Sequence, residues 1–231
     1  MTLADLIAQY RIEMSDADPK YLCNDEAVTL FLNEAENEAC IRARLIREKA
    51  NADICQINVL EGVSTYPLDP RIVEIVYGSM FYAGQLGLPY ILEKTTSDVL
   101  DQFRPYWRAQ HYRPTALIHY DSSIEFDCIP DTDYTVNLEV YRLPLLPMAF
   151  LPEIPPTPAV AHESPEINPI HHRHLVKWAK HRTYAIRDVE LNNIGLSEKY
   201  LSEFEDVFGK RPDAKYRRGA NANRPHHNLV W

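Results

Sequence analysis

The chain alternates between two kinds of hydrophobic spacing. Apolar side chains recur at helical intervals in residues 24–48, and the same spacing returns in residues 170–189 and 197–208. From about residue 52 to residue 142, short runs of β-branched and aromatic residues are instead separated by turn residues. This pattern predicts an α+β fold in which helices from both ends of the chain flank a set of strands.

The helix expected after residue 24 has an alanine-rich apolar stripe. Asn24 and Asp25 are candidate caps, because their side chains can accept the free N–H groups of the first turn. Small side chains suit the close approach of another helix. The residues of the stripe are Ala27, Leu30, Phe31, Ala35, Ala39, Ala43 and Ile46.

The same helix carries acids in its first half and arginines in its second. The charged side chains concerned are Glu34, Glu36, Glu38, Arg42 and Arg44. This order complements the helix dipole, and Glu38 and Arg42 are spaced four apart, so they can form an ion pair. We interpret the face as a packing or subunit contact, because no ExxH motif of a di-iron site accompanies the glutamates.

The middle of the chain reads as strands with one short helix. Residues 54–77 suggest a hairpin-like unit, and residues 96–103 a short helix capped by Thr96 or Ser97. Two further strands are expected to meet at residues 121–123. The last strand, residues 134–142, has a clear alternation, with Val136, Leu138 and Val140 on one face.

Prolines crowd residues 143–169, so this segment is expected to return over the surface in extended form. Two antiparallel helices should follow, the second ending at Gly209. The predicted domains are a discontinuous helical bundle (1–50 and 166–210), a β-rich insertion with the proline-rich return segment (51–165) and an extended C-terminal tail (211–231).

Composition narrows the possible functions. A formal charge of −9 over 231 residues argues against a dedicated nucleic-acid binder, since phosphate neutralisation needs clustered Lys and Arg. The four cysteines form neither a CxxC pattern nor a dense disulfide framework, and we expect reduced thiols. The N-terminus lacks the pattern of a signal peptide, and no stretch approaches the ~20 apolar residues of a membrane span.

A histidine cluster is the best candidate for chemistry. His171, His174 and His181 recur on one helix and could offer imidazole nitrogens to zinc, so a metal-dependent enzyme is the alternative from another functional class. No HExxH, GxSxG or Gly-rich phosphate loop accompanies them. We therefore expect no enzyme, no cofactor and no metal site. Separately, Trp107 and Trp178 are expected to be core residues.

The order of motifs resembles a known family. FLNEAENEACIRARLI is followed by INVLEGVSTYPLDP, then by a strand ending in YRLP, by PEINPIHHRHLVKWAKHR and by FGKR. Over about residues 20–211 this series is similar to the head-to-tail adaptor proteins of tailed phages, including the tail tubular protein A type. The resemblance implies a helical bundle with a β-rich insertion, located in the neck of the virion and assembled in the host cytoplasm.

The resemblance also implies partners: a ring of roughly twelve copies, the portal protein, and a tail nozzle or downstream tail protein. DNA would pass through an acidic channel without specific binding, and no membrane is involved. Glu34, Glu38, Arg42 and Arg44 are then candidate subunit contacts. The candidate residues for docking to the portal are Arg217, Arg218, Leu229, Val230 and Trp231. A neck or stopper protein further down the tail is the alternative within the structural class.

Overall fold

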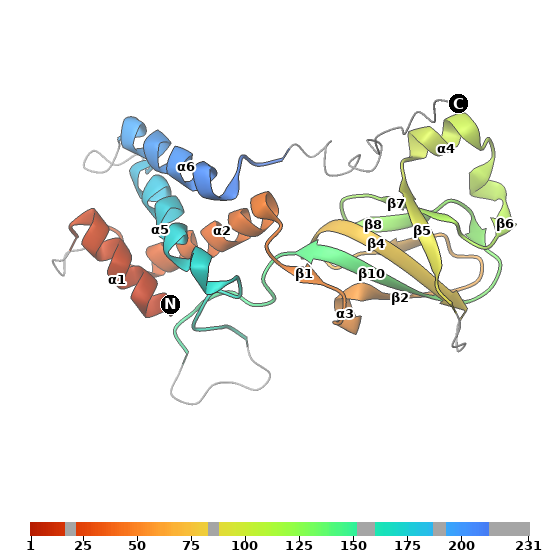
Figure 1. The fold of residues 1–231 in the computed structure, drawn as a ribbon, viewed down its shortest axis with the longest axis horizontal. Coiled ribbons are helices and arrows are strands. Elements are labelled where there is room, and N and C mark those ends of the chain that lie inside the picture. The colour runs from red at the N-terminus through yellow and green to blue at the C-terminus, as the bar shows by residue number, and fades with distance from the viewer. Residues whose placement is uncertain (17–21, 83–87, 152–159, 187–192, 213–231) are drawn as a thin grey trace, which may run out of the picture. The chain divides into compact units, whose positions relative to one another are not determined.

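The computed structural model divides the chain into two compact units (Figure 1). The residues that it describes are 1–16, 22–82, 88–151, 160–186 and 193–212. The helical unit contains Met1–Ile46 and Leu143–Arg211, and the β unit contains Arg47–Arg142. The mixed α+β class predicted from the two hydrophobic spacings is confirmed. The β unit is shorter than the predicted insertion, because the segment after Leu143 belongs with the helices.

Polar side chains define where the helices of the helical unit begin. These helices are α1 (Leu3–Met14), α2 (Asp25–Ala43), α5 (Pro169–Tyr184) and α6 (Ile194–Phe208). The caps Thr2, Asn24, Asn168 and Asn193 each accept a hydrogen bond from a backbone N–H of the first turn. Gly209 ends α6 at φ 81°, a value that glycine adopts without steric strain.

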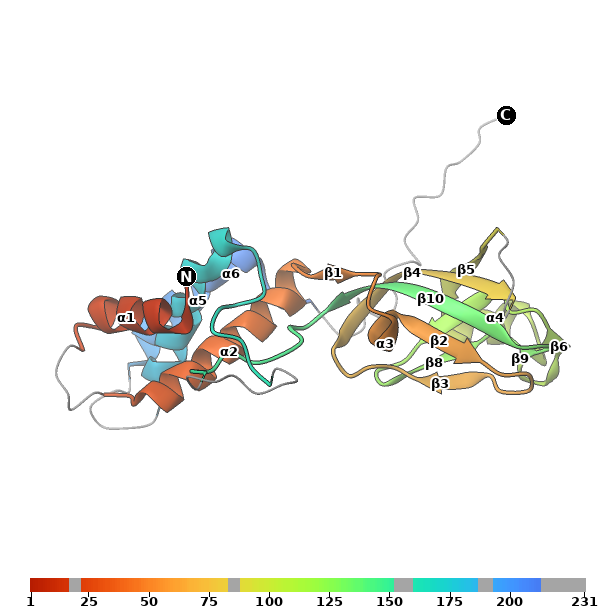
Figure 2. The same cartoon turned by 90° about the horizontal axis from the view of Figure 1, so that it is seen from below.

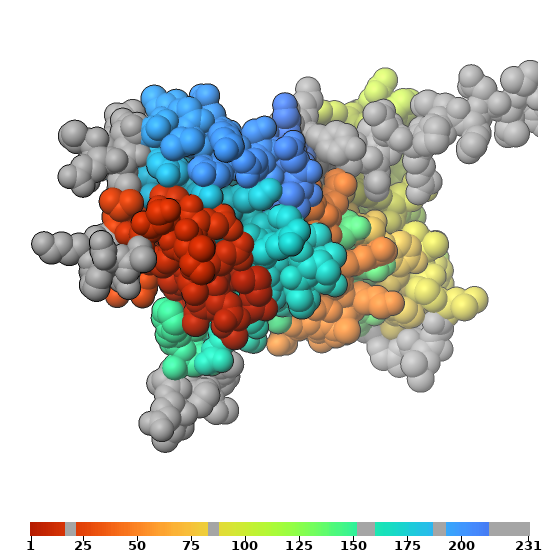
Figure 3. Space-filling model, turned by 60° about the vertical axis from the view of Figure 1, so that its left-hand side comes forward, coloured from red at the N-terminus to blue at the C-terminus, as the bar shows by residue number. Residues whose placement is uncertain are grey.

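Helix α5 is the central element of the helical unit and packs against α1, α2 and α6. Figure 3 shows α1 (red), α5 (cyan) and α6 (blue) side by side on one face. His181, near the end of α5, bonds Ser197 in the first turn of α6. Trp178, which lies earlier in α5, contacts Phe204, which lies later in α6. The expected antiparallel pair is confirmed. Helix α5 ends at Tyr184, earlier than the spacing predicts, and Val189 lies outside the described residues.

The buried face of α2 differs from the predicted stripe. Phe31, Ala35 and Ala39 are buried as expected, but Leu30 is 57% exposed. The face extends instead through Val28, Leu32, Glu36 and Cys40. It is wide because α2 contacts α1 and α5 and also bonds the segment that returns from the β unit. The predictions for Leu30 and for Ala43, which is also exposed, were therefore wrong.

The β unit is built on a curled sheet (Figure 2). Its strands are β1 (Arg47–Glu48), β2 (Gln56–Val59), β3 (Thr65–Pro67), β4 (Ile72–Tyr82), β5 (Tyr90–Thr95), β7 (Ala116–His119), β8 (Ser123–Phe126) and β10 (Tyr134–Arg142). The order is β1-β10-β4-β5-β7-β8-β3, with β2 also paired to β10. All pairings are antiparallel except β5 with β7.

Strand β10 confirms its predicted alternation, with Val136, Leu138 and Val140 buried. The predicted hairpin is wrong: β2 pairs β10 and β3 pairs β8, because the turn between them carries the chain across the curled sheet instead of folding it back. Ile54 and Cys55, expected in a strand, end the short helix α3 (Ala52–Cys55). At Gly78 a Cβ would lie 2.8 Å from a methyl group of Leu117, so glycine permits the strands to curl closely around the core.

Smaller elements complete the β unit. Helix α4 (Ser97–Phe103) is capped by Thr96, as predicted, and leads into the 3₁₀ turn η1 (Trp107–Ala109). Strands β6 (His111–Tyr112) and β9 (Ile129–Pro130) pair in parallel beside the main sheet. Leu100, Trp107 and Ile118 form a separate buried cluster that holds α4 and η1 on the sheet. Trp107 is thus a core residue, as expected.

Candidate functional site

One polar side of α2 binds the segment that returns from the β unit. The amide of Asn33 exchanges two hydrogen bonds with the backbone of Met148, at 2.7 and 3.0 Å. One turn later, Glu36 accepts hydrogen bonds from the backbone N–H groups of Glu166 (2.6 Å) and Ile167 (3.3 Å). Two neighbouring positions of one helix therefore hold both ends of the return segment.

Glu36 differs from its two neighbours in being buried. Glu36 is only 1% exposed. Burial raises the pKa of this carboxyl to about 7, even though its two backbone hydrogen bonds favour the charged form, and the nearby Glu166 raises it further. The protonation of Glu36 is therefore coupled to the fold.

The peptide of Ile167 is bound from both sides. Glu36 accepts its N–H, and its carbonyl lies 2.8 Å from Nε2 of His172, a buried residue of α5. The other ring nitrogen of His172 lies 3.2 Å from the amino group of Met1. The start of the chain, α2 and α5 thereby meet at the end of the return segment.

Arg42 is the centre of a second polar group, at the other end of α2. Its guanidinium bonds Glu38 at 3.0 Å and Glu205 of α6 at 3.1 Å. The guanidinium carbon lies 5.4 Å from the centre of the Trp178 ring and 5.5 Å from the centre of the Phe204 ring. The Arg42 side chain is only 6% exposed. The ion pair with Glu38 expected from the spacing is confirmed, and it serves the packing of α2 on α5 and α6.

The other predicted contact residues of α2 are also engaged within the chain. Glu34 forms an ion pair with Arg182 of α5 at 2.8 Å. Arg44 is the C-cap of α2, in the left-handed conformation with φ 53°. Arg211 lies 3.3 Å from Glu38, so the chain beyond α6 starts on the same surface. The contact between subunits predicted for Glu34, Glu38, Arg42 and Arg44 stays a prediction, and it competes with these internal pairs.

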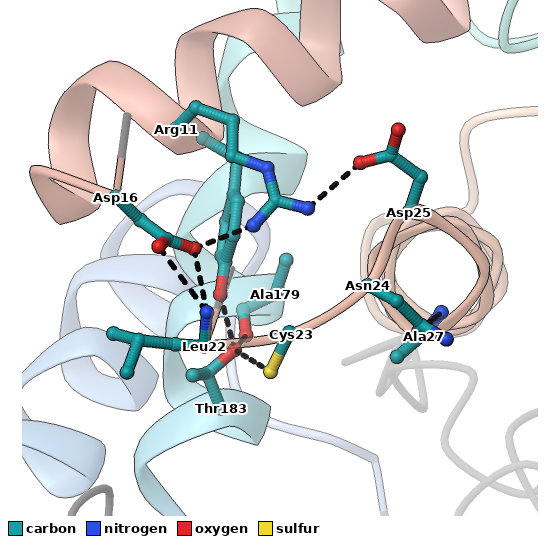
Figure 4. Close-up of polar contacts among 10 residues, drawn as sticks. Arg11, Asp16, Leu22, Cys23, Asn24, Asp25, Ala27, Ala179 and Thr183 are labelled. Carbon is teal, nitrogen blue, oxygen red and sulfur yellow. Dashed lines mark hydrogen bonds and ion pairs between the residues drawn. The ribbon is translucent and has the colours of Figure 1, made fainter. Parts of the chain in front are cut away.

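A third polar cluster joins α1 to α2 and α5 (Figure 4). Arg11 of α1 bonds Asp16 at 2.5 Å and Asp25, in the first turn of α2, at 2.7 Å. Beside this ion triad, the hydroxyl of Thr183 on α5 donates to the carbonyl of Ala179 and contacts Tyr10 at 2.7 Å. The helical unit is therefore held by several buried polar groups as well as by its apolar core.

The histidines that suggested a metal site face α6 instead. His171 and His174 lie against the ring of Phe208, and His181 bonds Ser197. Burial, together with nearby cations, lowers the pKa of His174, so this ring is favoured in its neutral form. Among the described residues, no three His, Cys, Asp or Glu side chains gather as metal ligands would.

Sequence reasoning grouped Glu36 with Glu34 and Glu38 as charged contact residues, although a signal in the sequence distinguished it. Its neighbours three and four positions away include Leu32, Ala39 and Cys40, whereas Glu38 has Glu34 and Arg42 at those distances. An acid with apolar neighbours on both adjacent turns is expected to be buried. The residues proposed for docking to the portal, Arg217 to Trp231, lie outside the described residues.

Two comparisons bear on the identity of the chain. No helix in the described part of the chain has the length and apolarity needed to cross a membrane. No curated protein matches the sequence. A family model described as SU10 adaptor protein matches residues 1–226, nearly the whole length. The chain therefore belongs to the SU10 adaptor protein family, a family of phage head-to-tail adaptor proteins.

Proposed function

We propose that this chain forms a ring of roughly twelve copies that joins the portal to the tail and lines the channel for DNA. The observation that carries the proposal is the family match over residues 1–226. An adaptor is a structural connector of the virion neck, and no catalytic group is needed for that role. The proposed partners are the portal protein on one side and a tail nozzle or downstream tail protein on the other.

The charge of the chain supports the passage of DNA. With a net charge of −9, copies that surround a channel would repel the phosphate backbone and keep DNA from adhering to the wall. DNA would then slide during packaging and ejection without specific binding. Assembly on the portal would take place in the host cytoplasm, before the tail is complete.

The C-terminal residues are the proposed contact with the portal. Arg217 and Arg218 offer cations, and Leu229, Val230 and Trp231 offer an apolar end with tryptophan, which is a favoured anchor in interfaces. In the described residues, Arg211 is bound to Glu38, so the segment would start from a fixed point on the helical unit. Truncation after Gly209 is expected to leave a folded chain that does not join heads.

Electron microscopy of the purified chain mixed with the portal ring of its phage tests the proposal. Added density in the form of a ring beneath the portal is the expected result. If the chain binds only to a preformed complex of the portal with another protein, it acts further down the tail, as a neck or stopper protein. If it binds neither, the connector role itself is wrong.

A further inference from the structure

A short stretch of the β unit combines aromatic rings with cations. Residues 103–113 read FRPYWRAQHYR, and residues 103–120 contain three arginines and no aspartate or glutamate. The whole chain has a net charge of −9, so its remainder is more acidic still. Tyrosine, tryptophan and arginine are also the residue types enriched at the energetic centres of protein interfaces.

The stretch is built on a rigid base. Trp107 is buried and donates its Nε1–H to Asp101 at 2.8 Å, and Arg108 bonds the same oxygen at 2.6 Å while its guanidinium lies over the Trp107 ring. Arg104 bonds the fully buried carboxylate of Asp127 at 2.7 Å. Trp107 and Arg108 thereby fix η1 to α4, and Arg104 fixes the end of α4 to the residue that follows β8.

This rigid base presents aromatic rings to solvent. Phe103 is 71% exposed and Tyr106 is 83% exposed, while Val99, one turn before Phe103, is also exposed. Tyr106 has φ 69°, a left-handed conformation that is unusual for a bulky residue and that requires the surrounding structure to hold it. An exposed ring on a strained and fixed backbone is preorganised for contact, so little conformational entropy is lost on binding.

We propose that Val99, Phe103 and Tyr106, with Arg104 and Arg108 at their border, form a contact with a second copy of this chain; we call them the α4–η1 surface. The inference rests on the proposed ring. Neighbours in a ring meet through two unlike surfaces, and a surface with apolar rings and cations complements an acidic face of the next copy. The two aromatic rings are buried against the neighbour, and the half-exposed arginines lie at the border of the contact.

The charges favour a protein occupant over DNA. Arg108 uses both terminal nitrogens on Asp101, and the ion pair lowers the pKa of Asp101, with the Trp107 N–H also contributing. Arg104 is paired with Asp127. The arginines are therefore neutralised in part, and the most exposed side chains of the surface are the rings of Phe103 and Tyr106, which a protein contact would bury and a phosphate contact would leave in solvent.

Photo-crosslinking in assembled particles tests the surface. The variant is Tyr106→p-benzoyl-L-phenylalanine, and Tyr77, a partly exposed residue of β4, is the control position. We expect an adduct between two copies of the chain from position 106 at a yield at least tenfold above that from position 77. An adduct to another virion protein or to DNA, or no adduct in particles that contain the chain, would overturn the inference and leave the adaptor role intact. Particles that lack the wild-type chain would overturn the proposed function instead.

A second variant separates contact from folding. Asparagine tolerates the left-handed conformation, so Tyr106→Asn removes the ring without adding strain. Its thermal unfolding is expected to match that of the wild type, while its incorporation into particles falls at least tenfold. Incorporation at the wild-type level would show that the ring of Tyr106 is not part of a contact.

Discussion

The charged face of α2 and the α4–η1 surface differ in whether their side chains are left available for an assembly contact. The α2 face has complementary charges in sequence, but Arg42, Glu38 and Glu34 find their partners within the helical unit. The α4–η1 surface also forms internal ion pairs, yet these leave Phe103 and Tyr106 in solvent. Paired charges indicate how a unit holds itself together, whereas apolar rings fixed in solvent indicate what remains for a partner.

The largest expected effect is the loss of stability when the buried Arg42 is replaced, compared with replacement of an exposed arginine. Arg42→Glu places a third acid beside Glu38 and Glu205, and we expect the free energy of unfolding to fall by about 3–5 kcal/mol. The matched control is Arg47→Glu in β1, because Arg47 is 54% exposed and pairs with Glu139; a loss of about 1 kcal/mol or less is expected there. Urea unfolding followed by circular dichroism measures both. If both variants lose the same free energy of unfolding, Arg42 does not stabilise the helical unit, and the predicted contact of Arg42 with a neighbouring subunit would be favoured.

Asp127 provides the corresponding test in the β unit. Its buried carboxylate accepts hydrogen bonds from the backbone of Thr115 and Ala116 and from Arg104. Asp127→Ala leaves these donors without an acceptor, and we expect a loss of roughly 3 kcal/mol in the free energy of unfolding. Asp127→Asn keeps one acceptor oxygen and should lose less than half as much. If the two variants lose the same stability, the base of the α4–η1 surface does not depend on this group.

Glu36 predicts a dependence on pH. Its pKa of about 7 in the folded chain is above its ordinary value of 4.5, so between these values the folded state binds the proton more tightly than the unfolded state. The free energy of unfolding should therefore fall as pH rises through this range, by roughly 3 kcal/mol at most. The measurement is urea unfolding at pH 5 and pH 8 for the wild type and for Glu36→Gln, which does not titrate. A stability difference between the two proteins that is constant with pH would contradict the raised pKa.

The sequence predicted elements that depend on local signals. The caps Asn24 and Thr96, the end of α6 at Gly209 and the alternation of β10 are each determined within a few residues. The pairing of β2 with β10 is not, because it joins residues more than seventy positions apart and nothing in the spacing specifies the partner. Local patterns predict elements, and long-range packing selects their neighbours.

In the candidate sites, too, contacts between residues close in sequence were predictable, whereas contacts that depend on long-range packing were not. The pair Glu38–Arg42 was predictable, since its members are four residues apart on a helix. Glu205, which completes the environment of Arg42, comes from α6 and could be identified only once the helices were packed. The exposure of Tyr106 was likewise hidden, because an aromatic residue in FRPYWRAQHYR is ordinarily assigned to the core, as Trp107 correctly was. A sequence shows which residues can form a site, and the fold decides which of them stay exposed.

The smallest expected effects compare two left-handed residues, one in each region. Arg44 ends α2 at φ 53° and Tyr106 precedes η1 at φ 69°. Glycine adopts this conformation without steric strain, so Arg44→Gly and Tyr106→Gly should each raise the free energy of unfolding by about 0.5–1 kcal/mol. Urea unfolding midpoints report this change. Incorporation into particles then distinguishes the two: Arg44→Gly should assemble as the wild type does, whereas Tyr106→Gly should not, because only Tyr106 keeps its strain to hold a ring in solvent. If Arg44→Gly is the variant that fails to assemble, the contact lies at the end of α2 and the comparison between the two regions is reversed.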